Sequence, residues 1–185
     1  MADILYLRGA PAFSAFRLQG LQQRIGAAVP GARLRVAEYW HFAVLRKALA
    51  DDERAQLAAL LEEQPDDAAM SCGELLLVTP RLGTISPWSS KATDIAWNSG
   101  LNAIERIERG IAYRVETAQG ALSAEQRARL VGLIHDRMTE TVLSQFEQTA
   151  DLFRHFAPQP LASVDLLGGG RAALLSRRGG RLSLS

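Results

Sequence analysis

The chain has 185 residues, of which 48% are hydrophobic and 22% charged, and its 21 basic residues nearly balance 20 acidic ones. This composition is that of an average globular protein with enough apolar residues for a core, which argues against wholesale disorder. A formal charge of +1 argues against a nucleic-acid binder, which needs a basic surplus. Without a signal peptide or an apolar run long enough to span a membrane, we expect a cytoplasmic protein.

The first part of the chain is predicted to fold as strand, helix, strand and helix. Residues 4–7 form a short apolar run typical of a strand, and Ser14 precedes apolar residues at helical spacing that end at Pro30-Gly31. The β-forming residues of 34–45 predict one long strand or two short ones. Asp51 is a candidate N-cap for the helix that follows.

The next part repeats this order. Residues 75–78, Leu-Leu-Leu-Val, are the clearest candidate for a buried strand. Ser90 could cap a short helix that ends near Gly100. Residues 104–117 then favour strands that are interrupted at Gly110.

Ser123 begins a capping box, because Gln126 can reach back to the amide of the cap residue. The helix predicted from this point runs to about Leu143. Residues 145–156 predict a further helix, and the prolines of 158–160 end it. Residues 176–185, rich in Arg, Gly, Ser and Leu without a stable period, read as a disordered or non-native tail.

Two stretches of the chain resemble each other. Residues 49–57 align without a gap on residues 122–130, at an offset of 122 − 49 = 73 positions. A shared amphipathic pattern could produce such a match by chance, so coincidence stays an alternative. The preferred interpretation is an α+β fold built from a duplicated unit, with halves at about 1–72 and 73–143 whose two sheets share a core.

The segment 79–96, with the sequence TPRLGTISPWSSKATDIA, leaves the buried strand as an unusual loop. Loops at strand ends often carry function, because a rigid scaffold positions them. Its hydroxyls, its basic residues and the amides before a helix at Ser90 could bind an anion, since helix N-termini favour negative charge. The candidate residues for a substrate-edge or interface loop are Thr79, Arg81, Thr84, Ser86, Trp88, Ser89, Ser90 and Lys91.

This segment closely resembles the N-terminal region of the large, single-chain phosphoribosylformylglycinamidine synthases. Three further blocks are similar to that family, namely IERIERGIAY at 104–113, HDRMTE at 135–140 and SVDLLG at 163–168. Four blocks in the same order are hard to reconcile with chance. Residues 1–78 fit the family more loosely, by pattern rather than by motif.

The resemblance implies an ATP- and glutamine-dependent amidation. Formylglycinamide ribonucleotide receives ammonia released from glutamine and becomes formylglycinamidine ribonucleotide. Members of the family are several times longer than this chain, and their ATP-binding synthetase core and glutaminase lie downstream. The resemblance therefore implies ATP and Mg for the full-length enzyme, and neither a cofactor nor a catalytic residue in this chain.

The resemblance also implies an organisation. Residues 1–143 would form a PurS-like domain, similar to a fused pair of the small separate subunit of the multi-subunit enzymes, and residues 144–175 would begin a linker. The implied role is to organise the enzyme, align the ammonia route and border the substrate site. The implied partners are the synthetase and glutaminase domains, and an apolar face left bare without them would favour self-association.

One short stretch departs from the family pattern. After Ile95-Ala96 the family has His, Asn and Cys, whereas this chain has Trp97, Asn98 and Ser99. A chemical role carried by either of the two exchanged residues is therefore in doubt.

Other candidate chemistry is weaker. The three histidines, at 41, 135 and 155, lie in different predicted elements, so we expect no metal site. Cys72 is the single cysteine and excludes an internal disulfide. No serine lies in a nucleophile-elbow motif, and the glycines of 168–171 favour a flexible linker or the start of a helix over a phosphate-binding turn. The alternating charges of 105–109 are typical of a solvated strand face or of pairing with charges on a neighbouring strand.

Two other classes of function stay open. The chain could be a freestanding assembly subunit that acts in trans with a separate synthetase. It could also be a small independent enzyme, which would predict nucleotide affinity of the isolated chain.

Overall fold

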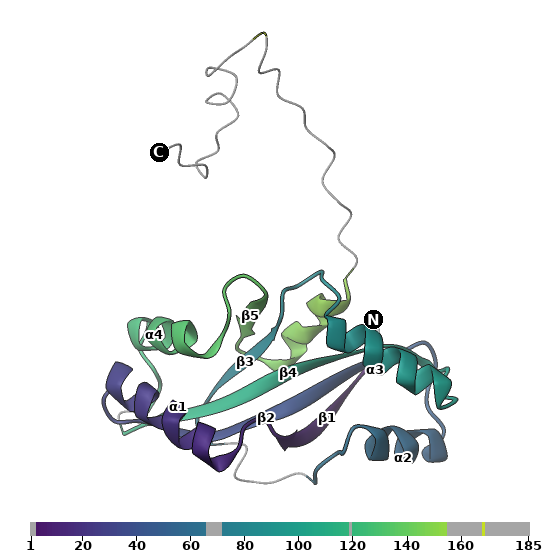
Figure 1. Ribbon diagram of the computed structural model, residues 1–185, viewed down its shortest axis with the longest axis horizontal. Coiled ribbons are helices and arrows are strands. Elements are labelled where there is room, and N and C mark those ends of the chain that lie inside the picture. Colours follow the sequence, from purple (N-terminus) through teal and green to yellow (C-terminus); the bar gives the residue numbers. More distant parts are fainter. Residues whose placement is uncertain (1–2, 66–71, 119, 155–167, 169–185) are drawn as a thin grey trace. The chain divides into compact units, whose positions relative to one another are not determined.

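Strands and helices alternate along the part of the chain that the computed structural model describes, residues 3–65, 72–118, 120–154 and 168 (Figure 1). Among these residues no helix is long and apolar enough to cross a membrane. The predicted tail, and the expected linker beyond Arg154 apart from Gly168, lie outside them. The elements are β1 (Asp3–Pro11), α1 (Ala15–Ala28), β2 (Ala32–Leu45), α2 (Asp51–Leu60), β3 (Glu74–Pro80), α3 (Pro87–Asn98), β4 (Ile104–Thr117), α4 (Ala124–Ile134), β5 (Glu140–Leu143) and the 3-10 helix η2 (Phe146–Phe153).

The strands form one antiparallel sheet in the order β1-β2-β4-β3-β5. The predicted α+β class is confirmed. The two long strands, β2 and β4, pair along their whole length, from Ala32 opposite Thr117 to Leu45 opposite Ile104. The expectation of two separate sheets is wrong, because this central pairing joins the strands of both halves into a single sheet.

Helices α1 to α4 pack in two pairs on one face of the sheet. Helices α1 and α4 share a core with one end of it, around Ile25 and Leu130, and α2 and α3 share a core with the other end, around Leu57 and Ala96 (Figure 1). Ala37 and Ala43 of β2 belong to these two cores and lie six positions apart, which places them on the same face of a strand.

The opposite face carries a third core, which η2 covers. Leu152 of η2 is fully buried against Phe42 and Leu77 of the sheet, and the rings of Phe146 and Trp40 lie 4.5 Å apart. Arg106 fastens η2 by donating to the Leu152 carbonyl. The helix expected over 145–156 is therefore a shorter 3-10 helix, shaped by apolar packing onto the sheet.

Helix starts depend on local caps. The predicted starts after Ser14 and Ser123 are confirmed, and in the second the Ser123 amide donates to the side chain of Gln126 at 2.8 Å. The predicted start at Ser90 is wrong, since α3 begins at Pro87 with Ser86 as its N-cap. Proline suits the first turn of a helix, where its missing N–H would have no partner.

Two other expectations fail for reasons of tertiary structure. The helix predicted to run to Leu143 ends at Ile134, because Glu140–Leu143 instead pairs with β3 as strand β5. Strand β4 is continuous through Gly110, where a break was expected. A Cβ at Gly110 would lie only 2.8 Å from the Val78 carbonyl oxygen, so glycine here permits the close approach of β3.

The substitution Gly110→Ala should destabilise the fold by about 1–3 kcal/mol, because the added methyl group displaces the backbone of β3. Urea denaturation measures this change in the free energy of unfolding. Gly132→Ala is the matched control, since nothing lies within 4 Å of its added Cβ and alanine in a helix is favoured over glycine by roughly 0.5–1 kcal/mol. Equal effects of the two variants would contradict this account of Gly110.

Candidate functional site

Helix α3 closes an open edge of β4. Strand β3 pairs with only one half of β4, between residues 74–78 and 111–115, so the other half needs different partners for its backbone. Ser89 Oγ donates to the Ile107 carbonyl at 2.6 Å, and Thr93 Oγ1 accepts from the Ile107 amide at 3.0 Å. Trp97 Nε1 donates to the Ile104 carbonyl at 2.8 Å. The three side chains are four residues apart, so one face of α3 satisfies the strand edge.

A buried carboxylate fixes the loop that leads into α3. Glu108 is fully buried, and its two oxygens accept from the Ser86 amide at 3.1 Å and the Ser86 hydroxyl at 2.8 Å. The Ser86 hydroxyl in turn accepts from the Ser89 amide at 3.0 Å. The solvated position expected for Glu108 is therefore wrong. Its negative charge sits at the helix N-terminus, where anions are stabilised.

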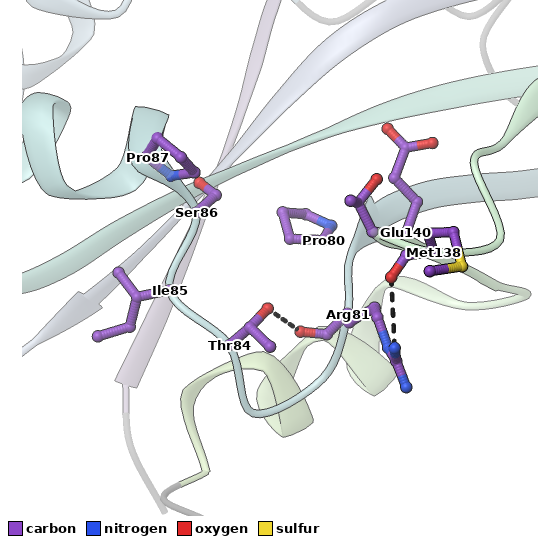
Figure 2. Close-up of a pocket in the computed structure, with 9 residues that line it drawn as sticks. Pro80, Arg81, Thr84, Ile85, Ser86, Pro87, Met138 and Glu140 are labelled. Carbon is purple, nitrogen blue, oxygen red and sulfur yellow. Dashed lines mark hydrogen bonds between the residues drawn. The ribbon is translucent and has the colours of Figure 1, made fainter.

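The loop borders a cleft of about 480 Å³, which Figure 2 shows. Within it Arg81 donates to the Met138 carbonyl at 3.3 Å, and the Thr84 hydroxyl donates to the Arg81 carbonyl at 2.6 Å. The lining residues are Pro80, Arg81, Thr84, Ile85, Ser86, Pro87, Met138, Thr139 and Glu140.

A smaller cavity of about 210 Å³ adjoins this cleft and shares three lining residues with it, Pro80, Ser86 and Glu140. Its floor is the sheet, and Trp88 of α3 forms part of its wall. The other lining residues are Tyr39, Val78, Thr79, Arg109, Gly110 and Ile111.

The structure brings only some of the predicted site residues together. Thr79 and Ser89 are buried and bonded to backbone carbonyls. Ser90 is exposed. Lys91 lines a separate cavity of about 220 Å³ between α2 and α3, so it does not share a cleft with Arg81.

Four residues that sequence reasoning missed lie at Trp88 or line the same cavity. The Arg109 guanidinium lies 4.6 Å from the Trp88 ring and 4.2 Å from that of Tyr39. The His41 ring stacks on Trp88 at 5.5 Å, and Glu140 lines the cavity beside them. The missing signal was the strand register, which sets His41 opposite Arg109.

Burial and nearby charges shift the pKa values of His41 and Tyr113. Burial, together with the neighbouring Arg109 guanidinium, lowers the pKa of His41 from 6.5 to about 4. Its Nδ1 has no hydrogen-bond partner among the described residues. Burial and the nearby Glu140 carboxylate raise the pKa of Tyr113 above its ordinary value. His41, stacked on Trp88, is therefore neutral at pH 7.

Apolar side chains stand outside this bonded framework. Ile85 is 61% exposed and Met138 76% exposed, and both line the larger cleft. Leu82, in the same loop, is 37% exposed. Exposed apolar clusters of this kind mark surfaces that contact other molecules or domains.

The family model for the formylglycinamide ribonucleotide amidotransferase N-terminal region matches residues 38–153. The chain belongs to this family. The match runs from β2 to the end of η2 and so includes the whole candidate site. The resemblance drawn from the sequence motifs is confirmed, and the family is that of the N-terminal domain of a larger amidotransferase of purine biosynthesis.

Within this amidotransferase N-terminal domain, the two exchanged residues have structural contacts. Trp97 bonds the edge of β4, as described above, and the Ser99 hydroxyl donates to the Ile95 carbonyl at 2.9 Å. No cluster of metal-binding side chains occurs in the described ranges.

Stability should fall as the pH drops from 7 to 5, because His41 binds a proton in the unfolded state more readily than in the folded one. The unfolded pKa of 6.5 and the folded value near 4 give a loss of about 2 kcal/mol over this window, with little change above pH 7. Urea denaturation of the wild type and of His41→Gln measures it. The variant should lose this component, and an unchanged slope would contradict the assignment to His41.

Proposed function

We propose that this chain is a noncatalytic, organising part of formylglycinamide ribonucleotide amidotransferase. The complete enzyme would convert formylglycinamide ribonucleotide to the amidine with ATP and glutamine, and this part would hold the synthetase and glutaminase domains in place. Family membership supports the proposal. The chemistry of the loop supports it too, because the hydroxyls of Ser86 and Ser89 are engaged in internal hydrogen bonds.

The loop 79–91 is an interface rather than the edge of a substrate site in this proposal. The observation that carries it is the exposure of Ile85 and Met138 beside hydroxyls of Thr84 and Ser86 that already make internal hydrogen bonds. An apolar partner surface would bury these side chains, and the free energy gained is about 25 cal/mol per Å² of apolar area removed from water.

An amidation assay tests this role. The isolated chain should form no amidine from formylglycinamide ribonucleotide, ATP and glutamine, and product formed by the chain alone would contradict the proposal. In the full-length enzyme, Ile85→Asp and Met138→Asp should lower activity by roughly tenfold, about 1.4 kcal/mol of lost interface energy. Phe16→Asp is the matched control, since Phe16 is 85% exposed on α1 and should leave activity unchanged.

The same assay separates the alternative of a freestanding subunit. Residues Met1–His155 form a unit with its own cores, which is compatible with action in trans. If the chain activates a synthetase that naturally lacks this domain, the freestanding alternative gains support. If activity requires covalent linkage, the domain acts within one polypeptide.

We infer further that the fold arose by duplication of a PurS-like unit. Shifting α2 by 73 positions gives 124–133, against the observed Ala124–Ile134, and shifting β2 gives 105–118, against Ile104–Thr117. The caps correspond as well, because the Ala50 amide donates to Glu53 at 2.9 Å and the Ser123 amide to Gln126 at 2.8 Å. These correspondences continue the offset of 73 found in the sequence.

The hydrogen bonds by which a helix covers an open strand edge are also related by the offset of 73 residues. In the first half Gln22 of α1 accepts from the Leu34 amide at 2.6 Å, and in the second half Thr93 of α3 accepts from the Ile107 amide at 3.0 Å. The two amides lie 107 − 34 = 73 positions apart. A helix thus covers the unpaired part of a long strand in each half.

The duplication predicts matched energetic costs. Gln22→Leu and Thr93→Val each leave an amide of a long strand without its acceptor, which should cost about 1–3 kcal/mol in either half. Urea denaturation measures both variants, with Thr84→Val as the control because its hydroxyl is exposed. A cost in one half only would show that the two halves do not share this device.

A further inference from the structure

Arg109 carries a positive charge without a carboxylate partner. It makes no ion pair and no hydrogen bond to another group within the described ranges of the chain, and two aromatic rings, Tyr39 and Trp88, lie against its guanidinium at 4.2 and 4.6 Å. Aromatic faces stabilise a partly buried cation. They leave the five N–H donors of the guanidinium without an oxygen acceptor among the side chains and backbone groups that the structure describes.

Two acidic residues beside Arg109 in the strand or the cavity accept hydrogen bonds from other groups. Glu108 precedes Arg109 in the strand, so its side chain points to the other side, where it accepts from Ser86. Glu140 lines the same cavity as Arg109, but its Oε2 accepts from the Asp136 amide at 2.7 Å. His41, which is paired opposite Arg109 in the sheet, supplies no negative charge and is neutral at pH 7.

The cavity that Arg109 lines has a volume of about 210 Å³, enough for a carboxylate or phosphate group. We propose that Arg109 binds an oxyanion in this cavity, with the guanidinium donating to two oxygens of the ligand. Planar guanidinium groups match carboxylate and phosphate in this bidentate way. The assignment does not depend on the organising role proposed above, since it concerns a ligand of the isolated domain.

Titration of the purified chain with inorganic phosphate, and separately with acetate, tests the proposal. The nuclear magnetic resonance signal of the Arg109 Nε–H group is followed while sodium chloride keeps the ionic strength constant, which removes general screening. A saturable shift is expected with at least one of the two anions. Tighter binding of phosphate would indicate a phosphate ester as the ligand, and tighter binding of acetate a carboxylate.

Four variants make the test specific, and isothermal titration calorimetry measures anion binding by each of them. Arg109→Met should abolish binding, and Arg109→Lys should weaken it several-fold because the fork of donors is lost. Glu140→Gln should strengthen binding several-fold, since it removes a negative charge from the lining, and a damaged fold would not do so. Arg46→Met is the matched control, because Arg46 also lies over a tryptophan, Trp97, at 5.5 Å but lines none of the three cavities described.

The outcomes decide the proposal. Loss of binding in Arg109→Met, retention in Arg46→Met and a gain in Glu140→Gln support it. A shift that never saturates in the wild type, or binding that persists in Arg109→Met, would overturn it. An activity defect of the interface variants is a separate result and leaves this site unaffected.

Discussion

The antiparallel pairing of β2 with β4 is the interaction on which the rest of the structure depends. It joins strands from both halves of the chain, and its length exceeds that of every other strand pair in the described sheet. Because β1 and β3 each cover only part of a long strand, the remaining parts need other partners for their backbone groups. Helices α1 and α3 supply them, which fixes where each helix lies.

The candidate site follows from this arrangement. Helix α3 must lie along β4 to satisfy Ile107, so the loop before it crosses the end of β3 and meets β5. The buried carboxylate of Glu108 then holds Ser86 at the helix start. Charge at this helix terminus is thus supplied by the chain itself, and the positive charge of Arg109 is left facing a cavity.

Local sequence signals predicted part of this fold. The capping box at Ser123 was recognisable because all its members lie within four residues. The strand character of 34–45 was recognisable because the segment is rich in β-forming residues, although one long strand and two short ones both stayed open. Strand β5 was missed because four residues become a strand only when β3 is beside them. The start of α3 at Ser86 had a local signal in Pro87, which suits the first turn of a helix. The hydrogen bond that fixes Ser86 comes from tertiary structure, because Glu108 lies 22 positions away.

The difference between local and long-range signals also explains which parts of the candidate site could be predicted from the sequence. The loop 79–91 was recognisable from its own composition, whereas the stacking of Trp88 with Arg109 and His41 depends on the register of two strands and the position of a helix. The family motifs identified the chain without any of this geometry. The roles of individual hydroxyls could not be predicted, because nothing in the neighbouring residues shows whether a serine faces a strand carbonyl or solvent.

The hydrogen bonds that Ile107 makes with Ser89, which donates to its carbonyl, and with Thr93, which accepts from its amide, have a consequence for how this surface meets other molecules. Displacing the loop and the start of α3 would strip the β4 backbone of its partners in a water-poor environment, at a cost of about 1–3 kcal/mol for each buried group left unpaired. The loop is therefore ordered before anything touches it. A molecule that contacts it loses little additional conformational entropy on association, so even a small contact area can give a defined geometry.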